Sequence, residues 1–309
     1  MRTAICGVWH VHAPDYTKAA LEQGSVLGFY EENEKLAAAF QAKFALPRFP
    51  SLDALLESEA EGVIVCSATC DHADHMVRIA NAGKHIFTEK VLALTTEDCL
   101  RVEEAVKRNR TGFVISLPWK YSRPCAAVKA AADSGVLGKL NYLRFRNCHS
   151  GSTANWLPSH FYNAAQCGGG AMIDLGAHGM YLTHWILGLP ETASSVFTLA
   201  HRSPKNTDGV EDNAVTVMGF PGGAIAVNET GFVSGVSPVV LEVFGENGFV
   251  RMENGRVTLR VGSEETELPL PEVCPAPIVQ FLTGNILPGC GIEEAKALTR
   301  MMEMAYSSK

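Results

Sequence analysis

The segment from Gly168 to Gly188, GGGAMIDLGAHGMYLTHWILG, carries the side chains best suited to chemistry in this chain. We predict a helix here, on which Asp174 and His178 lie four residues apart and share one face. Tyr181 and Trp185 continue that face, and an apolar stripe follows the adjoining flank. An acid beside an imidazole is what a proton-transfer site requires, so this pair needs one further partner from elsewhere in the chain.

The loop Gly7–His12, which follows the first predicted strand, is a candidate site for a dinucleotide. The dinucleotide-binding pattern GxGxxG places three glycines between a strand and a helix. Only Gly7 is present, and Trp9 and His12 occupy the other two spacings, so an ordinary strand–helix turn is the alternative. Glu31 ends the second predicted strand, where an acid accepts hydrogen bonds from ribose hydroxyls and repels a 2′-phosphate. It favours NAD over NADP, although a solvated surface glutamate also fits this position.

Two histidine pairs raise the question of a metal site. His10 and His12 are two residues apart, and His72 and His75 are three apart. No further ligands follow at a known spacing, so we expect no metal. The nucleophile elbow GxSxG and the phosphate-binding Walker loop are both absent from the sequence.

The elements that must position these residues fall into two groups. Up to residue 118, short apolar strands alternate with helices, which predicts a doubly wound parallel α/β sheet of the Rossmann type. The predicted strands are Thr3–Cys6, Ser25–Tyr30, Gly62–Cys66, His85–Thr88 and Phe113–Leu117. The predicted helices are Pro14–Gln23, Glu34–Ala42, a short one capped by Ser51, Asp71–Ala82 and Thr95–Arg110.

After residue 118 the pattern changes. We predict a helix from Ser122 to Gly135, a strand from Leu140 to Asn147 and a final helix from Ile292 to Tyr306. Strands dominate between Thr192 and Val261, and glycine-containing turns separate them, which indicates hairpins and an antiparallel sheet. We therefore expect a dinucleotide-binding domain over residues 1–118 and an α+β domain over residues 119–309.

The composition limits the class of protein. The chain has 309 residues, of which 47% are hydrophobic and 19% charged, with a net charge of −7. The negative charge argues against a nucleic-acid partner. No apolar run of eighteen residues exists, so we expect no membrane span, and the N-terminus lacks the features of a signal peptide. The nine cysteines contain no CxxC pair, which favours free thiols in a reducing cytoplasm.

Two motifs resemble the glucose–fructose oxidoreductase / inositol dehydrogenase / MocA (Gfo/Idh/MocA) family. In Gly62–Leu94 a strand ends in a small-residue turn, His72 opens the next helix, and AGKH at Ala82–His85 leads into Glu89-Lys90. The segment GGGAMIDLGAHGM matches the family pattern GGGxxxDxGxH. The chain differs from the family in its glycine loop, in Val91 where the family has proline, and in Ala68-Thr69 where it has Pro-Asn.

The resemblance implies a Rossmann domain, an open-sheet domain and NAD(P)-dependent oxidation or reduction of a sugar, cyclitol or related polyol. It also implies a homodimer or homotetramer formed through the C-terminal sheet. The cofactor-binding residues would be Gly7, Trp9, His10, His12, Glu31, Ser67, Ala68, His72, Glu89 and Lys90. The substrate-binding residues would be Lys120, Tyr121, Trp156, His160, Asp174, His178 and Tyr181. For Lys120 and Tyr121 the alternative is a polar hinge between the domains.

We take Lys90, Asp174 and His178 as the catalytic group. Oxidation of an alcohol needs a base for the hydroxyl proton, and a lysine amine can serve when burial and a nearby positive charge favour its neutral form. His178 would bind or relay the same proton, and Asp174 would orient one of the other two. A hydrolase or epimerase without net oxidation, and a non-catalytic sensor of NAD or sugar, remain alternatives.

Overall fold

The computed structural model describes residues 1–201 and 203–307 and divides the chain into two compact units. The first contains Met1–Leu117 and Pro275–Thr299, and the second contains Pro118–Cys274 and the chain from Arg300 onward. The segment Pro275–Thr299, which we expected in the second domain, therefore belongs with the first unit. Arg202 and residues 308–309 of the predicted second domain lie outside the described residues.

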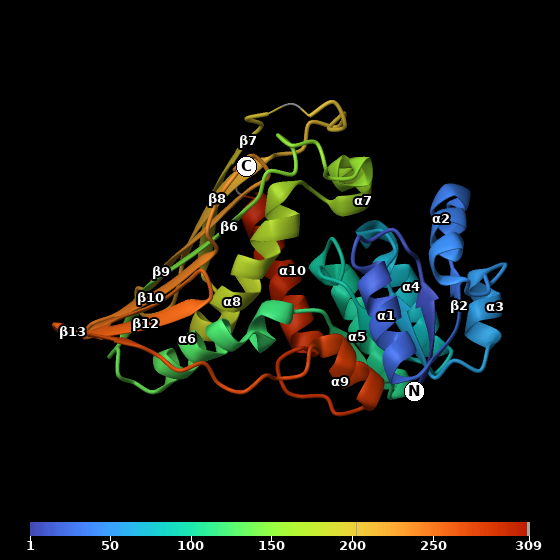
Figure 1. The fold of residues 1–309 in the computed structure, drawn as a ribbon, viewed down its shortest axis with the longest axis horizontal. Helices are drawn as coiled ribbons and strands as arrows, with labels where there is room; N and C mark the ends of the chain where they lie inside the picture. The colour runs from blue at the N-terminus through green and yellow to red at the C-terminus, as the bar shows by residue number, and fades with distance from the viewer. Residues whose placement is uncertain (202, 308–309) are drawn as a thin grey trace. The chain divides into compact units, whose positions relative to one another are not determined.

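A parallel sheet with the strand order β2-β1-β3-β4-β5 forms the centre of the first unit (Figure 1). Its strands are β1 (Arg2–Cys6), β2 (Ser25–Tyr30), β3 (Gly62–Val65), β4 (His85–Thr88) and β5 (Phe113–Ile115). The strand β3 is buried along its whole length, as expected when both faces of a sheet are covered. These strands confirm the predicted doubly wound sheet.

The helices of the first unit pack around this sheet, α1 against α9 and α4 against α5. They are α1 (Ala13–Gln23), α2 (Glu34–Phe44), α3 (Leu52–Glu57), α4 (His72–Asn81), α5 (Thr96–Asn109), α9 (Pro277–Thr283) and the first part of α10 (Ile292–Ser307). Two expected caps are present, since the hydroxyls of Ser51 and Thr95 accept hydrogen bonds from backbone amides at the start of α3 and α5. The helix α9 was not predicted.

Glu103 on α5 links that helix to the first part of α10. Its buried carboxylate accepts hydrogen bonds from Lys107 and, at 2.6 Å, from Lys296. The hydrogen bond from Lys107 has the larger effect on the carboxylate, and together with that from Lys296 it lowers the pKa of Glu103 from 4.5 to about 2. The carboxylate is therefore ionised at neutral pH and stabilises the packing of α10 in the first unit.

The second unit contains an eight-stranded sheet with the order β13-β12-β11-β10-β6-β9-β8-β7. The strands are β6 (Leu140–Cys148), β7 (Thr192–Thr198), β8 (Asn213–Gly219), β9 (Ile225–Gly231), β10 (Val240–Gly245), β11 (Gly248–Glu253), β12 (Arg256–Val261) and β13 (Glu264–Glu267). The turn Asn254-Gly255 has positive φ at both residues, as hairpin turns of this type need. The sheet is mostly antiparallel, but β6 pairs with β9 in parallel, because a long connection separates the two strands.

Within the described residues of the second unit, helices cover one face of this sheet. The helices are α6 (Arg123–Asp133), α7 (Ala164–Cys167), α8 (Ala177–Leu187) and the part of α10 from Arg300 onward, and Figure 1 shows α6 and α8 on the same side of the strands. Along β7 and β8 exposed side chains alternate with covered ones, which leaves Val196, Val215 and Val217 exposed. The second sheet is therefore open on one face, as the family resemblance implied.

The predicted helix from Gly168 to Gly188 is not one α-helix. Met172–Gly176 forms a π-helical turn, and α8 begins only at Ala177. Side chains from β9 stabilise this turn, since the Asn228 amide donates to the Gly176 carbonyl at 2.7 Å and the Thr230 hydroxyl to the Ala171 carbonyl at 3.2 Å. The wider π-helical turn changes the angular spacing between Asp174 and His178 from that of a regular α-helix.

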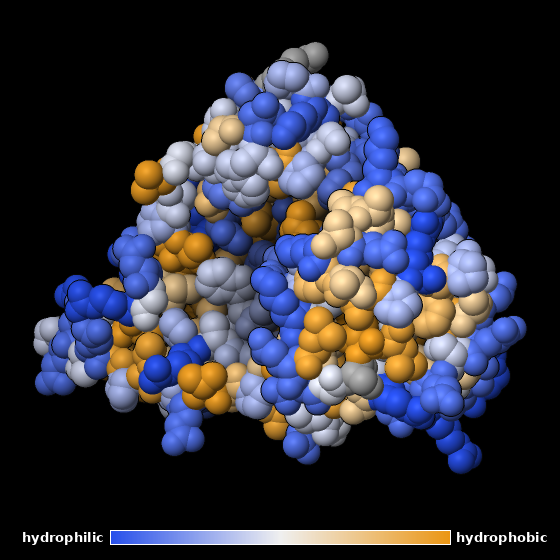
Figure 2. All heavy atoms as spheres, turned by 45° about the vertical axis from the view of Figure 1, so that its right-hand side comes forward, coloured by the Kyte–Doolittle hydropathy of each residue, from blue (hydrophilic) through white to orange (hydrophobic). Residues whose placement is uncertain are grey.

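The surface mixes polar and apolar residues. Figure 2 shows hydrophilic side chains over much of the face in view, with hydrophobic residues in smaller groups between them. Within the described residues, no helix combines the length and the hydropathy that are needed to cross a lipid bilayer.

Candidate functional site

The carboxyl ends of β1, β2, β3 and β4 place most of the predicted cofactor residues at one edge of the first sheet. Gly7 follows β1, Glu31 follows β2, Ser67 lies two residues after β3, and Glu89 follows β4. Ligands of doubly wound sheets bind at this edge. The topology therefore brings together residues that are up to 82 positions apart in the sequence.

Gly7 allows the loop after β1 to lie against the loop after β3. Its φ is +77°, and a Cβ atom at this position would lie 2.4 Å from the Cα of Ser67. No other residue fits there without moving the backbone. The His10 amide continues this contact by donating to the Cys66 carbonyl at 3.0 Å.

Glu31 holds the same loop from the other side. Its carboxylate is buried and accepts hydrogen bonds from the Val8 amide at 2.8 Å and from the Asn33 amide at 2.9 Å. Hydrogen bonds to an ionised group are among the stronger ones in proteins. A carboxylate has about four acceptor positions, so two such bonds leave capacity for ribose hydroxyls.

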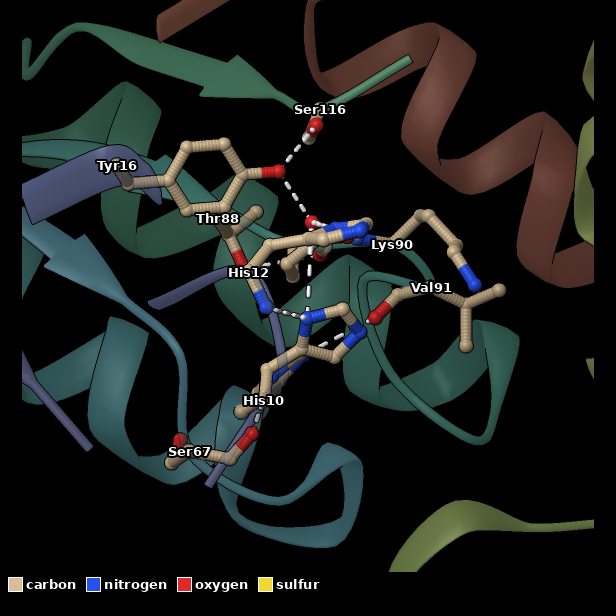
Figure 3. A network of polar contacts seen from close by, with 10 residues as sticks. His10, His12, Tyr16, Ser67, Thr88, Lys90, Val91 and Ser116 are labelled. Carbon is tan, nitrogen blue, oxygen red and sulfur yellow. Dashed lines mark hydrogen bonds and ion pairs between the residues drawn. The ribbon is translucent and has the colours of Figure 1, made fainter. Parts of the chain in front are cut away.

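A buried polar network surrounds Glu89 (Figure 3). Its Oε1 atom accepts a hydrogen bond from Tyr16, lies 2.8 Å from His12 Nδ1 and lies 3.7 Å from His10 Nδ1. Its Oε2 atom accepts from the Lys90 amide at 2.8 Å. The carboxylate is thus shared by two imidazoles, a phenol and a backbone amide.

The histidines determine the charge of this network. Burial alone would raise the pKa of Glu89, but charge on His10 and the hydrogen bond from His12 hold it well below its usual range. Burial and the Glu89 charge together raise the pKa of Tyr16 well above its usual value. Glu89 is therefore a carboxylate and Tyr16 a neutral hydroxyl at neutral pH.

His72 connects the loops after β3 and β4. Its Nε2 lies 3.1 Å from the Ser67 carbonyl oxygen and its Nδ1 lies 3.0 Å from the Val91 carbonyl oxygen. Burial lowers the pKa of His72, which favours the neutral ring at neutral pH. Ala68 and Trp9 are buried in the same unit.

Lys90 occupies the turn after β4. It is buried, and the peptide bond to Val91 is cis. In Figure 3 its side chain extends to the side opposite Tyr16, although its own amide binds Glu89. The backbone of Lys90 therefore belongs to the Glu89 network, and its amine points elsewhere.

The start of α1 differs from a usual phosphate-binding helix. The Ala13 amide donates to the His10 carbonyl at 3.0 Å, and the Asp15 amide donates to the His12 carbonyl at 2.9 Å. Pro14 has no amide hydrogen. The donors that normally bind an anion at a helix start are thus used within the loop or absent.

In the second unit, His178 pairs with Tyr181. The Nδ1 atom of His178 lies 3.0 Å from the Tyr181 hydroxyl, which also accepts from the Trp119 amide at 3.1 Å. His178 and Tyr181 are buried. The contact fixes the orientation of the His178 ring, and when Nδ1–H donates to the Tyr181 hydroxyl the Nε2 atom carries no proton and can accept one.

Asp174 is partly exposed in the π-helical turn, where its charge acts on His149. The His149 ring stacks on Phe232 at 4.9 Å between centroids and lies 4.6 Å from the Trp156 ring. Burial lowers the pKa of His149, and Asp174 opposes that shift. His149 is not among the predicted site residues, and its signal in the sequence is its position directly after β6.

The other predicted substrate residues also lie in the second unit. Lys120 is buried, with its Nζ atom 5.5 Å from the centroid of the Trp185 ring. Tyr121 is partly exposed, and 54% of Trp156 is exposed. Burial lowers the pKa of His160, which is partly buried. Their roles in binding stay predictions.

Two family models match the chain. One, described as an oxidoreductase family with an NAD-binding Rossmann fold, matches residues 1–115, and the other, the GFO/IDH/MocA C-terminal domain, matches residues 125–251. The first match covers the parallel sheet, and the second covers the second sheet from β6 into β11.

Individual proteins are similar over most of the chain. The myo-inositol 2-dehydrogenase of Thermotoga maritima is 28% identical over 76% of this chain and 67% of its own. The 1,5-anhydro-D-fructose reductase of Ensifer adhaerens is 25% identical over 80% and 76%. A crystal structure of an oxidoreductase from Agrobacterium radiobacter, in complex with NAD⁺, L-tartaric acid and magnesium, has a TM-score of 0.83 at 15% identity and covers 100% of this chain and 96% of its own.

Proposed function

Because the chain belongs to the GFO/IDH/MocA family of NAD-binding oxidoreductases, we propose that it transfers hydride between NAD and a hydroxyl or carbonyl carbon of a sugar, cyclitol or related polyol. The match of both family models to the two units supports this proposal most directly. The similar proteins named as an inositol dehydrogenase and an anhydrofructose reductase support the substrate class.

The residues of the first unit fit a dinucleotide. Gly7 gives the loop after β1 its close path, and Glu31 places a carboxylate after β2. We assign cofactor binding to these two, to Ser67 and Ala68, and to the loop up to His12. When bound, the cofactor supplies the nicotinamide ring that exchanges hydride with the substrate carbon. The negative charge of Glu31 favours NAD, because it repels a 2′-phosphate.

The proton transfer is assigned to Lys90 and His178 on chemical grounds. Oxidation of a hydroxyl releases a proton as the hydride leaves the carbon, and an amine or imidazole within hydrogen-bond reach accepts it. His178 is prepared for this role, since Tyr181 fixes its ring through Nδ1. Asp174 accepts a hydrogen bond from a second substrate hydroxyl in this proposal, and its charge faces His149.

The remaining substrate contacts are assigned to residues of the second unit. Trp156 offers an exposed aromatic ring, a surface on which sugars bind well, and Lys120, Tyr121 and His160 offer polar groups. We further propose that the open sheet face, with Val196 and Val215 exposed, forms a homodimer or homotetramer. A cytoplasmic location fits the nine cysteines, all of which are free thiols in the structure.

The test is a turnover assay on the purified chain. Cyclitols, alditols and aldoses are incubated with NAD, and NADH is followed by absorbance. We expect NADH from at least one substrate, with kcat lowered about 10²- to 10⁴-fold in Lys90→Met and unchanged in Lys35→Met, a control at an exposed lysine. NAD binding without NADH formation from any of these substrates would contradict the proposal.

A second assay tests the cofactor preference. Glu31→Gln removes the charge that repels a 2′-phosphate, so the affinity for NADP should rise relative to that for NAD. Glu32→Gln, at the exposed neighbouring position, serves as the matched control. An unchanged ratio of the two affinities in Glu31→Gln would show that this residue does not select the cofactor.

A further inference from the structure

His10, His12 and Glu89 form a compact group of metal-ligating side chains. Their ligand atoms all lie within 4.8 Å of one another. The Oε1 atom of Glu89 is 2.8 Å from His12 Nδ1 and 3.7 Å from His10 Nδ1 (Figure 3). We expected no metal from the sequence, because the third group lies 77 residues from His12 and the fold brings it to the histidine pair.

These distances suit a tetrahedral ion. Zinc binds imidazole nitrogen and carboxylate oxygen at about 2.0–2.2 Å, which places neighbouring ligand atoms about 3.3 Å apart. The two measured separations lie on either side of that value, and the two histidine nitrogens lie within 4.8 Å of each other, so rotation of the side chains can close the group around one ion. Two histidines and one glutamate are also the protein ligands of known catalytic zinc sites.

The groups behind the three side chains are those that a metal site requires. The Tyr16 hydroxyl binds Glu89 Oε1 and lies 2.8 Å from the Ser116 hydroxyl, while the Lys90 amide holds Glu89 Oε2. Such contacts orient ligands and affect metal affinity. Binding through His10 Nδ1 would exchange its 3.2 Å contact with the His12 amide for a bond to the ion.

The group is also accessible. The side chains of Glu89 and His10 are 1% and 8% exposed, whereas that of His12 is 45% exposed. An ion can therefore reach the buried carboxylate from the side of His12. Water can occupy the remaining coordination position on that side, as in zinc sites with three protein ligands.

We propose that His10, His12 and Glu89 bind one divalent transition-metal ion of the zinc class. The site lies wholly within the first unit. It uses His10 and His12 of the loop that the proposed function assigns to the cofactor, but metal binding to the chain without cofactor does not depend on hydride transfer.

The experiment uses the full chain after dialysis against a chelator. Cobalt(II) is added and its visible absorption is recorded, and zinc affinity is then measured by calorimetry. We expect one ion per chain and a cobalt spectrum of four-coordinate type, which zinc abolishes. His12→Ala and Glu89→Gln should weaken binding more than about 100-fold, and Tyr16→Phe about 10- to 100-fold.

The control is His75→Ala, which removes another histidine of the same unit and should bind cobalt as the unchanged chain does. If Glu89→Gln does not fold, His12→Ala provides the test of the metal site. The His12 side chain is 45% exposed, so we expect the variant without it to fold. Absence of the cobalt spectrum, or equal affinity in His12→Ala, would overturn the proposal. NADH binding is measured separately by fluorescence. If the protein binds cobalt but turns over no polyol, the proposed function is refuted and the proposed metal site is not.

Discussion

Replacement of Tyr181 by phenylalanine tests whether this hydroxyl prepares His178 for catalysis. The variant keeps the buried ring but loses the 3.0 Å contact with His178 Nδ1 and the 3.1 Å hydrogen bond from the Trp119 amide. A neutral hydrogen bond contributes about 0.5–1.5 kcal/mol, and the Trp119 amide is only partly buried. We therefore expect the free energy of unfolding to fall by about 1–2 kcal/mol.

The effect on catalysis should be larger than this loss of stability explains. Without the hydroxyl, the His178 ring loses the contact that fixes its orientation, which should lower kcat about 10- to 100-fold. The KM for the polyol should change little, because the ring and the substrate contacts remain. Steady-state rates of NADH formation give both constants, and urea unfolding gives the stability.

Tyr162→Phe is the matched control. Tyr162 is buried in the same unit, and its hydroxyl lies 2.9 Å from the Ser152 hydroxyl. The free energy of unfolding of this variant should fall by about 1 kcal/mol, similar to the change in Tyr181→Phe, and its kcat should not change. The reasoning is refuted if both variants lose activity to the same degree, or if Tyr181→Phe keeps the full kcat.

Two further changes test the first unit. Gly7→Ala should unfold at a lower temperature than Gly83→Ala, because φ is positive at both positions but only the Cβ at residue 7 would overlap the backbone. Equal melting temperatures would contradict this. Glu103 has a lowered pKa of about 2, so its stabilisation is complete above pH 4.5 and is lost as the pH falls toward 2. In urea unfolding, Glu103→Gln should therefore lower the free energy of unfolding by about 2 kcal/mol at pH 6 and by less at pH 3. Glu104→Gln, which changes an exposed neighbouring residue, should not show this dependence on pH.

Local pattern was sufficient for most of the fold. The strand–helix alternation up to Leu117 follows from short apolar runs and from caps such as Ser51 and Thr95, which act within a few residues. The turn Asn254-Gly255 likewise identifies a hairpin by itself. These features could be predicted because their causes are close in the sequence.

Features that depend on distant partners could not be predicted. The π-helical turn at Asp174 is stabilised by Asn228 and Thr230 from a later strand. The segment Pro275–Thr299 belongs with the first unit through contacts such as that of Lys296 with Glu103. No local pattern records either interaction.

The candidate site shows the same division. The i, i+3 spacing of His178 and Tyr181 could have indicated their contact, as could the i, i+4 spacing of His12 and Tyr16. The contact of His12 and Tyr16 with Glu89 could not be predicted from spacing. It arises because the sheet places the carboxyl ends of β1 and β4 near each other.

Transfer of deuterium is the most direct test of the central claim. A polyol that the chain oxidises is prepared with deuterium on the reacting carbon and incubated with NAD in ordinary water, and the reduced cofactor is analysed by mass spectrometry. Direct hydride transfer predicts that the NADH carries the deuterium of the substrate, and that Lys90→Met forms the same labelled product far more slowly. Reduced cofactor without the label, or substrate converted with no labelled cofactor at any time, would contradict the account.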